Sequence, residues 1–174
     1  MKALVAAAVV IVGLGSVAFA DPTTPPPISD SHFRFKIPTG WTNKTTGDPR
    51  LFTLAVDEPH NLVYQAKVQL GGAPANEEML DRYADDARKS VTKRLPDSKF
   101  RALERTIVLI DEVQAARFVF EMIPPGGGGA IRQLQYYVAS GQEHAVLTFT
   151  APAEHFAENV KLFEATALAT TIKK

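Results

Sequence analysis

The sequence predicts an α+β protein, an α/β/α sandwich with a central, mainly antiparallel sheet and two main helices. Several segments alternate apolar and polar residues with the two-residue period of a half-buried strand, and short turns join them. Residues 76–95 and 152–174 instead carry apolar residues at three- and four-residue steps, which is the period of an amphipathic helix. The alternating strands disfavour a doubly wound parallel sheet, and they predict that one sheet face is solvated or only partly covered.

Residues 1–20 have the composition of a secretory signal peptide. Lys2 precedes an uncharged apolar run at residues 3–14, and Ala18, Phe19 and Ala20 form a small-x-small cleavage site. The run is too short to prefer spanning a bilayer of ~30 Å, so a cleaved signal is favoured over a retained anchor. We therefore expect cleavage after Ala20, a periplasmic or secreted mature protein, and no stable membrane anchor after cleavage.

Residues 21–30 form a Pro-rich leader, and residues 31–174 are predicted to form a single domain. The leader contains four prolines and almost nothing that a core could bury, which is typical of a semi-extended spacer. A ligand for a proline-recognising module is the alternative interpretation of this segment.

Three strands are expected at the start of the domain. The first, at residues 33–37, alternates three apolar with two basic residues and ends at a Pro-Thr-Gly turn before Trp41. The others are expected at residues 51–56 and 62–70, and Gly71 and Gly72 end the third.

A helix follows at residues 76–95. Asn76 can cap its first turn, the next two residues are acidic as the helix dipole favours, and Pro96 ends it. Its apolar stripe consists of Leu80, Tyr83, Ala84, Ala87, Val91 and Leu95.

The second half of the chain is predicted to be an antiparallel meander followed by a helix. Strands are expected at residues 100–110, 116–122, 134–138 and 145–149, with turns at 111–112 and 140–142. The helix begins at Pro152 and runs almost to Lys174, and its stripe consists of Phe156, Val160, Phe163 and Ala167.

Composition excludes several classes of function. The chain has 19 basic and 19 acidic residues, so no excess of positive charge predicts a nucleic-acid partner. It has no cysteine, which excludes disulfides, thiol nucleophiles and thiolate metal sites.

No catalytic residue, metal site or cofactor is predicted. The four histidines share no metal-ligand spacing, and in the Glu143–His144 and Glu154–His155 pairs neighbouring side chains point apart. No serine lies in a nucleophile-elbow motif. Asp81 and Asp85 share a helix face and could offer carboxylates to calcium or to a basic partner, but interleaved basic residues favour a solvated, charge-balanced face.

Two groups of residues are candidate partner-binding sites. The first is the connector of Gly126, Gly127, Gly128 and Gly129, a loop tip that could adapt to a partner, with a plain linker as the alternative. The second is a polar and aromatic sheet face of Tyr137 with Gln133, Gln135 and Arg117, because tyrosine and arginine are common in binding hot spots. The alternative for this face is that the second helix covers it.

The layout resembles the PsbP/Mog1-like superfamily, whose secreted bacterial members include DcrB-like proteins and domains of unknown function. The resemblance rests on the strand that runs into Pro38, Gly40 and Trp41, on the order helix–meander–helix, and on the aromatic anchors Phe156 and Phe163. It implies a small sandwich around an antiparallel sheet, and action by binding or assembly without catalysis.

The function expected from the sequence is that of a non-enzymatic periplasmic or secreted binding domain. Such a domain would assist the assembly or stability of an envelope protein partner. The alternative is a carrier of a small apolar ligand in a cavity between sheet and helices, which the ten phenylalanines would suit.

Overall fold

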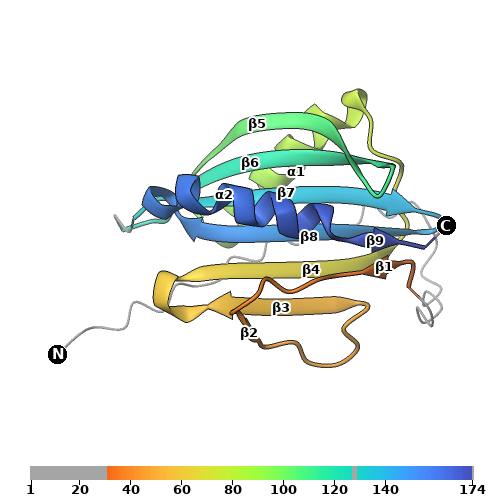
Figure 1. Cartoon of the computed structure of the whole chain (residues 1–174). Coiled ribbons are helices and arrows are strands. Elements are labelled where there is room, and N and C mark those ends of the chain that lie inside the picture. Colours follow the sequence, from red (N-terminus) through yellow and green to blue (C-terminus); the bar gives the residue numbers. More distant parts are fainter. Residues whose placement is uncertain (1–30, 127–128, 174) are drawn as a thin grey trace.

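A computed structural model describes residues 31–126 and 129–173, in which seven strands form one antiparallel sheet (Figure 1). The strand order is β2–β3–β4–β8–β7–β6–β5. The bounds are β2 Thr42–Asn43, β3 Phe52–Asp57, β4 Leu62–Leu70, β5 Lys99–Ile110, β6 Val113–Ile123, β7 Ile131–Ser140 and β8 Glu143–Pro152. The predicted signal peptide and Pro-rich leader lie outside the described residues.

The predicted meander is confirmed as β5, β6, β7 and β8, each paired antiparallel with the next. Its first and last turns are tight: Asp111 and Glu112 both have positive φ, and so does Gly141 in the last turn. β8 then pairs with β4, which joins the meander to the N-terminal strands.

Helix α1, Glu77–Arg94, covers one face of the sheet near β5 and β6. The Asn76 side chain accepts a hydrogen bond from the backbone N–H of Met79 at 3.0 Å, which confirms the predicted cap. The buried stripe of the helix packs against Ala116, Phe118, Phe120 and Met122 of β6, and it consists of Met79, Leu80, Ala84, Ala87 and Val91.

Helix α2, Ala153–Leu168, covers the opposite face, so the predicted α/β/α sandwich is confirmed (Figure 1). The expectation that this helix runs almost to Lys174 is wrong, because the chain leaves it after Leu168 and forms β9, Thr171–Ile172. β9 pairs with β1, Phe33–Arg34, which is all of the predicted strand at residues 33–37 that forms. Among the described residues, neither helix combines the length and the apolar character that crossing a membrane requires.

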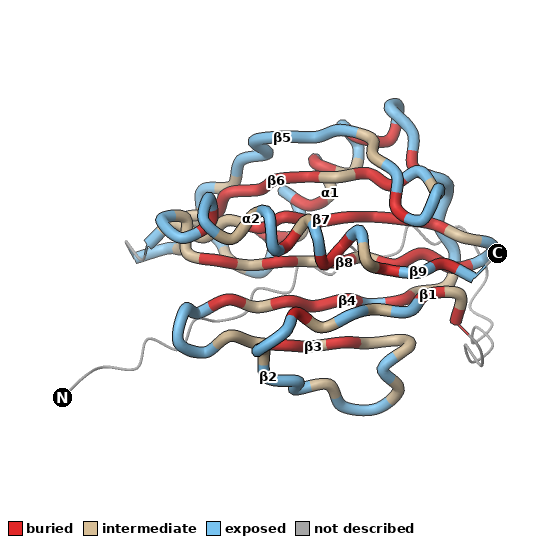
Figure 2. The backbone as a smooth tube through the Cα atoms, viewed as in Figure 1, coloured by how far each residue is buried: buried red, intermediate tan, exposed pale blue. Residues whose placement is uncertain are grey.

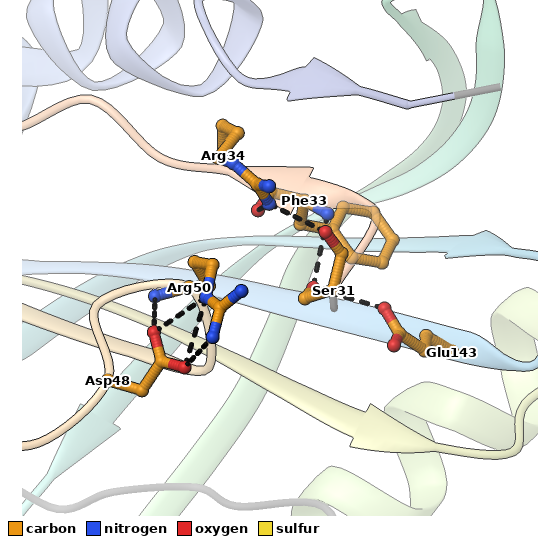
Figure 3. A network of polar contacts seen from close by, with 6 residues as sticks. All are labelled: Ser31, Phe33, Arg34, Asp48, Arg50 and Glu143. Carbon is orange, nitrogen blue, oxygen red and sulfur yellow. Dashed lines mark hydrogen bonds and ion pairs between the residues drawn. The ribbon is translucent and has the colours of Figure 1, made fainter. Parts of the chain in front are cut away.

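Hydrogen bonds fasten the first described residues to the sheet (Figure 3). The buried carboxylate of Glu143, at the start of β8, accepts from the Ser31 hydroxyl at 3.0 Å and from the His32 N–H at 3.1 Å. Nearby, hydrogen bonds from Arg50 lower the pKa of Asp48 to about 2. The Lys173 N–H donates to the His32 carbonyl, so both ends of the described chain meet beside β8.

The packing of α2 depends on Phe163. Its buried ring contacts Phe149 of β8 at 5.2 Å between centroids and meets Trp41 edge-on at 6.3 Å. We expect Phe163→Ala to lower the free energy of unfolding by about 3–5 kcal/mol, because it opens a cavity between helix and sheet. Urea denaturation measures this, with Leu162→Ala, at the exposed neighbouring position, as the control that changes stability by about 0.5 kcal/mol or less. Equal losses in both variants would contradict the assignment.

Candidate functional site at the β5 edge

The predicted polar and aromatic face is divided between the two sides of the sheet. Gln133, Gln135 and Tyr137 share one face of β7, as their alternation predicts, but Arg117 lies on the other. Arg117 stands opposite Tyr136 in the register and donates to Glu104 at 2.8 Å and to Glu164 of α2 at 2.9 Å. The expectation that Arg117 joins the face of Tyr137 is therefore wrong, because the β6–β7 register offsets the two strands by one residue from that arrangement.

The side chains that do share the face are buried. Gln135 is fully buried and donates to the Gln133 side chain at 3.2 Å, which in turn donates to Thr150 at 3.2 Å. Tyr137 is 5% exposed and lies in the apolar cluster beneath α1, so the first helix covers it and not the second. In the described structure these three residues therefore serve internal packing.

Hydrogen bonds from Tyr137 and His144 hold the loop that leads into α1 against the sheet; we call these contacts the His144 junction. The Tyr137 hydroxyl donates to the Ala73 carbonyl at 3.0 Å, and His144 Nδ1 lies 2.7 Å from the Gly71 carbonyl. Gly72 has a φ of +105°, and a Cβ added there would lie 2.4 Å from the Tyr137 hydroxyl oxygen. Glycine is thus required here by both backbone conformation and space.

Other chemistry-bearing residues do not gather into a site. In residues 31–126 and 129–173, no three or more His, Asp and Glu side chains group as a metal ion requires. Glu143 and His144 point apart as predicted, the first toward Ser31 and the second toward Gly71.

A cleft of about 420 Å³ separates α1 from β5. It is lined by Asp81, Ala84, Asp85, Arg88, Phe100, Ala102 and Arg105. Arg105 of the strand bridges to Asp81 of the helix at 2.9 Å, and Arg88 pairs with Asp85 at 3.4 Å. This confirms the charge-balanced interpretation of the two aspartates.

Beside this cleft, β5 is the outermost strand of the sheet in the described part of the chain. Its residues 101–106 are all exposed, and Figure 2 shows this strand exposed over most of its length where β7 and β8 are buried. Its outer row of backbone N–H and C=O groups therefore has no strand partner among the described residues. We call this row, with the side chains of β5, the β5 edge.

The predicted glycine tip adjoins one end of the β5 edge. Lys99, the first residue of β5, pairs with Ile123, and Gly126 follows Ile123 by three residues in the β6–β7 connector. Gly126 and Gly129 are exposed, while Gly127 and Gly128 lie outside the described residues. The edge itself was not predicted as a site, although a signal existed: the first strand of a meander has no sequential neighbour on one side.

Comparison with known proteins places the fold. No protein-family model and no curated protein matches the sequence. The cyanobacterial PsbP protein (CyanoP) of Synechocystis is similar in structure, with a TM-score of 0.65 and 9% identity over 81% of this chain and 86% of that chain. This chain has the PsbP/Mog1-like fold.

Two further solved structures share that fold. LpqN of Mycobacterium tuberculosis, described as involved in cell envelope biogenesis, has a TM-score of 0.52 and 14% identity, over 82% of this chain and 83% of LpqN. The Ran-binding protein Mog1p of Saccharomyces cerevisiae has a TM-score of 0.51 and 10% identity, over 76% of this chain and 78% of Mog1p. The predicted superfamily resemblance is confirmed at the level of the fold.

The His144 junction makes stability depend on pH. Burial lowers the pKa of His144 below its ordinary value of 6.5, so the unfolded chain takes up a proton at a higher pH than the folded one. The free energy of unfolding should therefore be level above pH 7 and should fall as the pH drops through 6.5. In His144→Gln this component of the decrease should disappear, whereas the exposed His155→Gln should keep it. Urea denaturation at a series of pH values tests this, and an unchanged profile in His144→Gln would refute it.

Proposed function

We propose that this chain is a non-enzymatic binding domain that acts in the periplasm or after secretion and assists the assembly or stability of an envelope protein. The observation that carries the proposal is the β5 edge beside the α1–β5 cleft. An exposed sheet edge offers backbone hydrogen bonds to another chain, and a cleft next to it offers room for that chain's side chains.

The apolar part of the edge supports the same function. Thr106, Ile107, Val108, Leu109 and Ile110 form an uncharged run at the end of β5, and Leu109 is 60% exposed. Exposed edges of soluble proteins are ordinarily protected by charged residues, bulges or covering elements. Ile110 is buried and Ile107 and Val108 are half-buried, so Leu109 is the large apolar side chain that this stretch exposes. The stretch itself carries none of these protecting features, which leaves its backbone and Leu109 open to a partner.

The location rests on sequence and on the similar proteins. Residues 1–20 have the composition of a signal peptide, and LpqN is described as involved in cell envelope biogenesis. Mog1p is described as Ran-binding, which gives a precedent for protein binding on this fold. Gly126 and Gly129 are included in the proposed partner surface because they adjoin the Lys99 end of the edge. Arg117, Gln133, Gln135 and Tyr137 are left out of it, because they are engaged in internal contacts.

The structure gives the ligand-carrier alternative no specific support. The aromatic residues that suggested it stack on one another in the core: Tyr64 lies 4.5 Å from Phe149 between ring centroids, and Phe149 lies 5.2 Å from Phe163. These rings fill the layer between α2 and the sheet.

Site-specific cross-linking in the native envelope tests the function. A photo-reactive amino acid at Leu109 should capture one dominant envelope protein, because this side chain projects from the proposed surface. The same amino acid at Leu168 of α2, which is 55% exposed, is the matched control and should capture none. Mass spectrometry identifies the captured protein. Equal capture at both positions, or no specific capture at Leu109, would contradict the proposal.

A further inference from the structure

We propose that the β5 edge binds its partner by strand addition: an extended, acidic-ended segment of the partner pairs with β5 as an eighth strand of the sheet. The side chains on one face of this added strand enter the α1–β5 cleft, and its acidic end lies near Lys99. This inference rests on the proposed function and specifies its mode of binding and the chemistry of the partner segment.

The backbone of β5 is suited to such pairing over its second half. The register with β6 shifts once, between Ala102 and Glu104, and then runs without interruption from Glu104 to Ile110. A regular stretch of this length matches the usual length of a strand. The bulge at Leu103 marks one limit of the regular edge, since a bulge bends the strand and interrupts its ladder.

The cleft lies mainly beside the first half of β5, with Arg105 as its lining residue in the regular stretch, so an added strand would reach most of it by extending past the bulge. Phe100 and Ile107 of β5 face α1, so one face of the added strand would also be turned toward that helix. The lining of the cleft is mainly polar: Ala84, Phe100 and Ala102 are its uncharged residues, and the Arg105–Asp81 ion pair is among the charged ones. A groove between an edge strand and a helix thus combines main-chain pairing with a pocket for side chains, which is the arrangement used in β-augmentation.

Basic residues near the start of β5 favour an acidic end on the partner segment. On the face away from α1, Glu121 forms ion pairs with both Arg101 and Arg132, so one carboxylate serves two guanidinium groups. Lys99 is exposed on the same strand as Arg101 and adds a further positive charge. This end of the edge is therefore net positive, and carboxylates on an added strand would be attracted to it.

A second copy of this chain fits the edge less well. If two β5 strands paired antiparallel, Lys99 and Arg101 of one copy would lie against residues 106–110 of the other. That segment is Thr-Ile-Val-Leu-Ile and contains no carboxylate. Arg101 would then face only apolar residues across the interface, while Lys99 would lie near Asp111 of the other copy, so only part of the positive end would be matched by an acidic residue. A partner segment that combines an apolar part with an acidic end satisfies both halves of the strand.

A defined peptide tests strand addition. The probe is a synthetic peptide of about ten residues that alternates valine and threonine and ends in two aspartates, titrated into the mature protein by calorimetry. Two methylated versions of the peptide are the controls for main-chain pairing. One carries N-methyl groups on the odd-numbered amides and the other on the even-numbered amides. We expect one of the two to bind at least about tenfold more weakly, because its methyl groups remove the donors that face β5.

Protein variants test the cleft and the charge. Ala102→Trp should fill the cleft and weaken binding of the peptide about tenfold, whereas Ala157→Trp on the exposed face of α2 should leave it unchanged. Lys99→Glu should weaken binding several-fold at low salt, whereas Lys161→Glu, also on α2, should not. Circular dichroism checks that each variant is folded, and the methylated peptides test the unaltered chain in any case.

The outcomes separate this inference from the proposed function. Full binding of both methylated peptides, or no binding of the parent peptide, would overturn strand addition. A concentration-dependent dimer of the unliganded protein that Ala102→Trp abolishes would overturn it in favour of a second copy. If Leu109 still captures an envelope protein in either case, the proposed function stands and only its mode is wrong. If the peptide binds as expected but Leu109 captures nothing, the edge accepts strands and the proposed envelope role fails.

Discussion

β4 and β8 pair antiparallel along eight residues of each strand, and this pairing joins two parts of the chain that are separated by more than seventy positions. Each part alone is a set of strands connected by turns, and the apolar face of those strands must be buried against another element. The pairing brings Tyr64 of β4 beside Phe149 of β8, and Phe163 of α2 stacks on Phe149 in turn. It also places Glu143 where Ser31 can reach it. The core under α2 and the anchoring of the first described residues therefore depend on this one non-local pairing.

The two faces of the sheet are covered in different ways, and this difference leaves the surface where binding is proposed. Under α2 the cover is extended by Phe35, Ile37 and Trp41, which pack against the same core. On the other face α1 lies near β5 and β6, and its apolar cluster contains no described residue of β3 or β4. Because α1 packs beside the outermost strand, the helix and the strand edge together form a cleft. The meander order thus determines both where α1 finds apolar side chains and where a strand is left without a neighbour.

The periodicity of the sequence predicted most helices and strands, but it could not predict contacts between residues that are distant in the chain. The 62–70 strand and the Asn76 cap were predicted correctly because alternation and capping are properties of neighbouring residues. β9 has only two residues and shows no period of its own, so the sequence pattern predicts a helix that continues through it. The position of Arg117 depends on how β6 aligns with β7, and the proline- and glycine-rich connector between them gives no turn type from which to read that register. The β5 edge escaped prediction because openness is a property of the whole sheet.

The composition of β5 explains how such an edge can avoid uncontrolled pairing. Charges lie at Lys99, Arg101, Glu104 and Arg105, and the bulge at Leu103 falls among them, so the first half of the strand carries two of the devices that prevent uncontrolled pairing. The second half carries neither, although β-branched and apolar residues there favour strand pairing. Protection of the whole strand would have been simple to achieve by a single charge near Leu109. Because only the first half of β5 is protected, a partner strand would pair in a defined register. A strand shifted toward Lys99 would meet the bulge, and it would need carboxylates to balance the basic residues there.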